Sequence, residues 1–86
     1  MNLKKFEEIM SKNRRFYSGD GYFEGLVIIK RYLPDSQSLS AVSDGHAHSV
    51  DGDDLVEVGI SEDDTKKLAS LGWQFDEDVG NLCYEP

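Results

Sequence analysis

The chain is 86 residues long, of which 38% are hydrophobic and 30% are charged. A chain of this length has room for one small core, so a second domain and a large active-site architecture are excluded. With 17 acidic and 9 basic residues the formal net charge is −8, which opposes direct binding to nucleic acid and to an anionic membrane surface.

The charge is distributed unevenly along the predicted single domain, residues 1–86. Residues 1–31 carry seven basic and four acidic side chains, whereas from residue 32 onward two basic side chains accompany thirteen acidic ones. The predicted helical segment, residues 1–33, is therefore mildly basic, and the predicted strand-rich segment, residues 34–86, is strongly acidic.

Two helices are predicted in the first third of the chain, over residues 2–13 and 22–33, because apolar residues recur there at helical spacing. The Val-Ile-Ile run of the second segment favours a strand, but the length of the segment and the stop signal of Pro34 favour a helix. Asp20 is placed to cap its N-terminus. Gly25 in a helix interior costs about 1 kcal/mol relative to Ala, which indicates a close approach to another element.

Residues 38–60 are predicted to form a three-stranded antiparallel meander. Apolar and polar residues alternate on both sides of Asp44-Gly45, and Asp-Gly is favoured in two-residue hairpin turns because both positions need positive φ. The pair Asp51-Gly52 repeats this signal before residues 56–60, which predicts a second turn and a third strand.

A third helix and two further strands complete the predicted order. Ser61 begins the helix as its N-cap and Gly72 ends it. Trp73 and Phe75 alternate in a strand and are predicted to lie in the core, and residues 82–84 form the closing strand after a polar turn. The order ααβββαββ is an α+β fold, in which helices pack on one side of a small antiparallel sheet.

Several different short motifs are spread over most of residues 22–84. They are Gly25-Leu26, Ile28-Ile29 and Tyr32-Leu33, a polar hairpin carrying Asp44, a helix ending with Leu68 and Leu71-Gly72-Trp73, and then Asp76-Glu77-Asp78. This pattern resembles a group of short uncharacterised bacterial and bacteriophage proteins, which usually have a further aromatic residue, often Trp, on the last strand, where this chain has Leu82 and Tyr84. The resemblance implies an α+β fold and an origin in a mobile genetic element, and it transfers no catalytic residues.

Candidate metal ligands are densest around the first predicted hairpin. On a strand His46 and His48 project to the same face, so their imidazoles can share one metal ion with Asp44 or Asp51 as a carboxylate ligand from a flanking turn. A solvated hairpin explains the same residues and is the favoured interpretation, and a contact to a partner through the two histidines is a third. No cofactor is predicted, and metal binding remains one of these three open interpretations.

Cys83 is the only cysteine, which excludes an intramolecular disulfide and favours a reducing compartment. No nucleophile motif surrounds it, so a buried structural thiol is predicted and an enzyme is not. The N-terminal residues lack the apolar core of a signal peptide, so a cytoplasmic location is expected.

The acidic residues of the second segment are the candidate contacts to a partner. They are Asp51, Asp53, Asp54, Asp63, Asp64, Asp76, Glu77 and Asp78. The sequence predicts a non-enzymatic interaction protein of phage or mobile-element origin, which binds a basic, nucleic-acid-binding surface of a host protein as an inhibitor or DNA mimic, as anti-CRISPR and anti-restriction proteins do. The alternatives are a small metal-binding protein that uses His46 and His48, or an accessory domain whose charge serves solubility.

Overall fold

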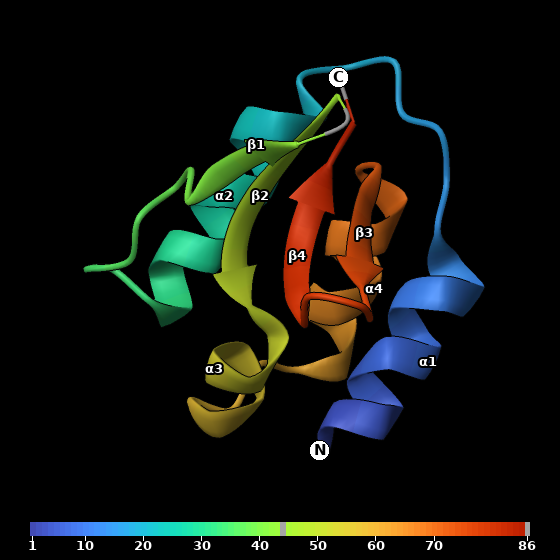
Figure 1. Ribbon diagram of the computed structural model, residues 1–86. Coiled ribbons are helices and arrows are strands. Elements are labelled where there is room, and N and C mark those ends of the chain that lie inside the picture. Colours follow the sequence, from blue (N-terminus) through green and yellow to red (C-terminus); the bar gives the residue numbers. More distant parts are fainter. Residues whose placement is uncertain (44, 86) are drawn as a thin grey trace.

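Helices and strands alternate in pairs along residues 1–43 and 45–85, which are the residues described by this computed structural model (Figure 1). The elements are α1 (Leu3–Asn13), α2 (Gly21–Tyr32), β1 (Ala41–Ser43), β2 (His46–Asp51), α3 (Gly52–Glu57), α4 (Glu62–Ser70), β3 (Trp73–Asp76) and β4 (Asn81–Tyr84). The strands form one antiparallel sheet in the order β1-β2-β4-β3. The α+β class is therefore as predicted.

The predicted helix ends are confirmed by their caps. The Asp20 carboxylate accepts a hydrogen bond from the Phe23 N–H at 3.4 Å and begins α2. The Ser61 hydroxyl accepts one from the Asp64 N–H at 3.0 Å and begins α4. Gly72 follows α4 with a φ of +98°, a conformation that favours glycine and ends the helix.

The third strand of the predicted meander is wrong, because residues 52–57 form helix α3 instead. Asp53 and Asp54 lie in its first turn, where the unpaired N–H groups of a helix favour negative charge. Leu55 is fully buried in the core. Burial of this apolar side chain stabilises the helical turn that directs it inward. Positive φ occurs at Gly45, in the first predicted turn, but not at Gly52, so the second Asp-Gly pair begins a helix rather than a hairpin.

A β-bulge in β2 positions α3 beside the β3–β4 turn. The register pairs His48 with Cys83 and Asp51 with Asn81, so three steps along β2 correspond to two steps along β4. This register shift lies at the end of β2, and α3 starts directly after it.

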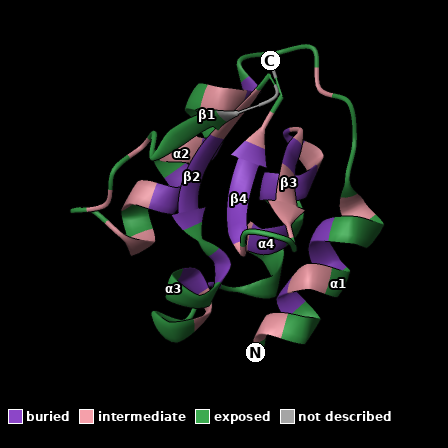
Figure 2. Ribbon diagram, in the orientation of Figure 1, coloured by how far each residue is buried: buried purple, intermediate pink, exposed green. Residues whose placement is uncertain are grey.

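The core lies between the sheet and helices α2 and α4, which cover its rear face in the view of Figure 1. Figure 2 shows the buried residues along β2 and β4 and on the inner sides of the helices. Trp73 is fully buried, as predicted, and its indole N–H donates to the Gly21 carbonyl at 2.9 Å. Phe75 is half-buried and meets Phe6 edge-to-face, with ring centroids 5.9 Å apart.

Candidate functional site

Two acidic segments that are far apart in the sequence meet at one end of the sheet. β2 leads into α3 at Asp51, and β3 leads into the β3–β4 turn at Asp76. The N–H of Gly52 donates to the carbonyl of Gly80 at 2.9 Å, which joins the start of α3 to this turn. Both segments therefore lie at the lower end of the sheet in Figure 1.

We call the six carboxylates of these two segments the acidic end. They are Asp51, Asp53, Asp54, Asp76, Glu77 and Asp78. All are exposed except Asp76, which is half-buried and accepts hydrogen bonds from the N–H groups of Asp78 and Val79 at 3.0 and 3.4 Å. Asp76 thus shapes the turn that presents its neighbours. Within residues 1–43 and 45–85, no ion pair joins any of the six carboxylates to a cation.

Glu7 of α1 extends the acidic end. Glu7 and Glu77 both line a small hollow of about 160 Å³ between α1 and β3. A hydrogen bond with the Glu77 side chain, partial burial and the charge of Glu77 raise the pKa of Glu7 above its usual value. Glu7 could not be found from the sequence, because it lies among the basic residues of the first segment and nothing in its local pattern indicates a partner so distant in sequence.

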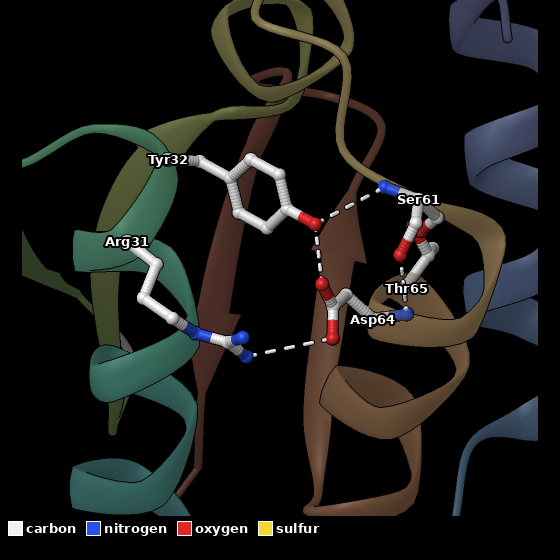
Figure 3. A network of polar contacts seen from close by, with 5 residues as sticks. All are labelled: Arg31, Tyr32, Ser61, Asp64 and Thr65. Atoms are coloured by element: carbon white, nitrogen blue, oxygen red, sulfur yellow. Dashed lines mark hydrogen bonds and ion pairs between the residues drawn. The ribbon is translucent and has the colours of Figure 1, made fainter.

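Asp63 and Asp64, also predicted as partner contacts, lie elsewhere, in the first turn of α4. Figure 3 shows the Asp64 carboxylate accepting a hydrogen bond from the Tyr32 hydroxyl and facing Arg31, whose Nη2 is 3.5 Å from Asp64 Oδ1. The Tyr32 hydrogen bond and the Arg31 charge lower the pKa of Asp64, so the carboxylate stays ionised. Asp64 therefore joins α4 to α2, whereas Asp63 is exposed beside it.

The two predicted metal-binding histidines have their ring centroids 6.5 Å apart. His48 is buried, with Nδ1 2.9 Å from the Asn81 side-chain oxygen, and the half-exposed His46 has Nε2 3.5 Å from a Glu85 carboxylate oxygen. Asp44, one of the two carboxylates predicted as the third ligand, lies outside the described residues, and the other, Asp51, is exposed at the end of β2. In the part of the chain that the structure describes, no three or more His, Cys, Asp or Glu side chains are grouped to hold a metal ion. The site with Asp44 stays a prediction.

Cys83 is buried on β4, as predicted. Its cross-strand neighbour in the register is His48. Burial, followed by the charge of Asp76, raises the pKa of the thiol above its usual value. The neutral thiol form is therefore favoured, which suits a structural role and disfavours nucleophilic chemistry.

Comparisons with protein-family models, with curated proteins and with solved structures found no match. Among residues 1–43 and 45–85, no helix combines the length and the apolar character that crossing a membrane requires. The functional assignment therefore rests on the chain's own side chains, and among the sites predicted from sequence the acidic end is the one that gathers exposed groups from several elements.

Proposed function

We propose that the chain is a non-enzymatic binding protein whose acidic end docks on a basic surface of a partner protein. The observation that carries the proposal is the meeting of two exposed acidic segments, from α3 and the β3–β4 turn, with no cation paired to them in the described residues. Unpaired surface carboxylates attract a positive groove over about 10 Å at moderate salt, and this attraction steers association.

A nucleic-acid-binding surface is the partner chemistry that fits best. Such surfaces are built from Lys and Arg side chains that contact successive phosphates. The acidic end offers carboxylates in place of phosphates, and the hydrogen bond between Gly52 and Gly80 holds the two segments together before binding. Because the two segments are already joined, association loses less conformational entropy in ordering them. We therefore infer a DNA-mimicking inhibitor, in the manner of anti-restriction or anti-CRISPR proteins carried by mobile elements.

The test uses the tagged full chain as bait in a bacterial lysate at low salt, followed by mass spectrometry of the bound proteins. We expect nucleic-acid-binding proteins to be recovered, and we expect both duplex DNA and added salt to release them. The double variant E77Q/D78N should weaken binding of a recovered partner by about tenfold.

The matched control is D35N/E62Q, which removes the same charge from exposed positions outside the acidic end. It should bind the partner as the unaltered chain does. Recovery of no basic partner, insensitivity of binding to DNA, or equal weakening by both double variants would overturn the proposal.

A further inference from the structure

A surface hollow of about 780 Å³ lies at the other end of the β3–β4 hairpin, away from the acidic end. It forms where the loop between α1 and α2 passes the start of β3 and the end of β4. Its lining includes Arg14, Arg15, Phe16, Tyr17, Gln74 and Tyr84. Its volume falls within the range of about 300–1,000 Å³ that is usual for small-molecule sites.

Two tyrosine rings and a glycine form one wall of the hollow. The Tyr84 ring packs against Trp73, with centroids 5.6 Å apart, so its position is set by the core. A Cβ at Gly72 would lie 3.3 Å from the Tyr84 ring and 4.0 Å from the Cβ of Tyr17. Gly72 therefore separates the two tyrosines, and any side chain there would fill space between them. This wall is formed before any ligand binds.

The loop that carries the arginines is attached to α4. The Arg15 N–H donates to the carbonyl of Ala69 at 3.2 Å, at the C-terminal end of α4. Arg14 and Arg15 are both exposed, and Phe16, which follows them, is 96% exposed. Two guanidinium groups and an exposed aromatic ring thus line the hollow on a segment whose backbone is joined to α4 at Arg15.

The side chains that line the hollow carry a net positive charge, although the net charge of the chain is −8. Carboxylates lie close outside this lining, with Glu24 beside Tyr17 and with Glu7 and Glu77 beside Arg14 in the neighbouring smaller hollow. Among the described residues that line it, Glu85 alone is acidic, and its carboxylate oxygen lies 3.5 Å from His46 Nε2. The two positive charges of Arg14 and Arg15 therefore exceed the one negative charge of this described lining. A large unpaired ring beside two arginines is a combination that recognises a planar group joined to an anion.

We propose that this hollow binds a mononucleotide-sized ligand, in which a phosphate is attached to an aromatic base. The planar guanidinium groups of Arg14 and Arg15 match phosphate oxygens with paired N–H donors. Phe16 offers a face on which any base can stack. A longer nucleic acid is disfavoured because its further phosphates would meet the field of a molecule with a charge of −8.

The test is a titration of the ¹⁵N-labelled full chain with adenosine monophosphate, adenosine and inorganic phosphate, followed by amide chemical shifts. We expect the monophosphate to shift amides of residues 14–19, 72–74 and 84–85, and to bind at least about tenfold more tightly than either of its parts. R14Q/R15Q and F16A should each weaken binding by about tenfold or more. These side chains are exposed, so the variants should keep the amide spectrum of the folded chain.

The matched control is K4Q/K5Q, which removes two positive charges from exposed positions on α1 outside the hollow. It should leave the affinity unchanged. The proposal is overturned by an absence of shifts at about 10 mM monophosphate, by equal weakening in the control, or by inorganic phosphate binding as tightly as the monophosphate. Tighter binding of a single-stranded oligonucleotide would also overturn it, in favour of a polynucleotide site.

Discussion

Gly25 lies directly against the indole of Trp73. A Cβ at this position would lie 1.9 Å from Trp73 Nε1, and the indole is held in place by its hydrogen bond to the Gly21 carbonyl. The ring cannot move away without breaking a buried hydrogen bond. The closeness of α2 to β3 therefore depends on the missing side chain.

We expect Gly25→Ala to lower the free energy of unfolding by about 2 kcal/mol or more, because overpacking and a strained hydrogen bond outweigh the gain of about 1 kcal/mol in helix propensity. Urea unfolding followed by tryptophan fluorescence measures this change. Val27→Ala, at an exposed position of the same helix, should change the free energy by less than about 0.5 kcal/mol. A Gly25→Ala variant as stable as the unaltered chain would contradict the packing argument.

The close approach of Gly25 to another element and the burial of Trp73 in the core were both predicted from the sequence, and both predictions are confirmed. A glycine in a helix interior is a local signal, since its cost has to be offset by something nearby. That Trp73 is the neighbour depends on how β3 packs against α2. A contact across so many residues leaves no local pattern in the sequence.

At the scale of elements, the contact between α2 and α4 depends on the carboxylate of Asp64. Tyr32 at the end of α2 donates its hydroxyl to this carboxylate, and the Ser61 N–H donates to the same hydroxyl at 3.4 Å (Figure 3). The pKa of Asp64 is lowered in the folded chain, first by this hydrogen bond. Its ionised form therefore contributes stability above the unfolded-state pKa, and this contribution is lost as the pH falls through the lowered folded-state value.

We expect Tyr32→Phe to lower the free energy of unfolding at pH 7 by about 1 kcal/mol. This is less than a buried hydrogen bond to a charged acceptor usually contributes, because the Asp64 carboxylate is partly exposed. The difference should shrink as the pH falls through the lowered folded-state pKa of Asp64, because the carboxyl group is then protonated in both states. Urea unfolding at pH 7 and at a series of acidic pH values measures it. Tyr22→Phe is the control, because the Tyr22 hydroxyl donates to the neutral carbonyl of Ser38 at 3.4 Å. The change that Tyr22→Phe makes in the free energy of unfolding should therefore be the same at neutral and acidic pH. Equal pH dependence in both variants would refute the role of Asp64.

The helix caps at Asp20 and Ser61 were predictable because a cap is decided by residues within one turn. Helix α3 was not, because Asp-Gly serves both a hairpin turn and the start of a helix. The choice between them is made by the burial of Leu55 and by the hydrogen bond from Gly52 to Gly80, both of which depend on distant parts of the chain. Residues within one turn therefore predict where a helix begins or ends. They do not predict whether a strand or a helix follows an Asp-Gly pair.

At the scale of the whole molecule, the uneven charge of the sequence becomes an arrangement in space. The pairing of β2 with β4 brings the acidic segments of α3 and the β3–β4 turn together, while Asp64 is drawn to α2. Strand order cannot be derived from alternation alone, so the sequence predicted an acidic half but not which of its residues meet. The contribution of Glu7 from the basic half depends on the same long-range packing.

Carboxylates that meet at one end repel one another, and this repulsion opposes folding. The pKa of Glu7 is raised in the folded chain, first by a side-chain hydrogen bond with Glu77 that needs one protonated carboxyl group, then by partial burial and by the charge of Glu77. When both carboxyl groups are ionised, this hydrogen bond is lost and the repulsion remains. When the pKa of a group is higher in the folded than in the unfolded chain, the group's contribution to stability is fully present below the unfolded-state pKa. That contribution is lost as the pH rises through the folded-state pKa. At neutral pH the pair therefore destabilises the fold.

We expect Glu77→Gln to raise Tm by about 1–3 °C at pH 7 and low salt, because it removes this repulsion, and we expect the gain to disappear near pH 3 or in about 1 M NaCl. Thermal unfolding followed by circular dichroism measures it. Glu62→Gln is the control, since it removes a charge that favours the N-terminus of α4 and should give no gain. An equal gain at both positions would attribute the effect to net charge rather than to the Glu7–Glu77 contact. Because E77Q/D78N is also expected to weaken partner binding, we expect the carboxylate of Glu77 to lower the stability of the fold and to strengthen binding of the proposed partner.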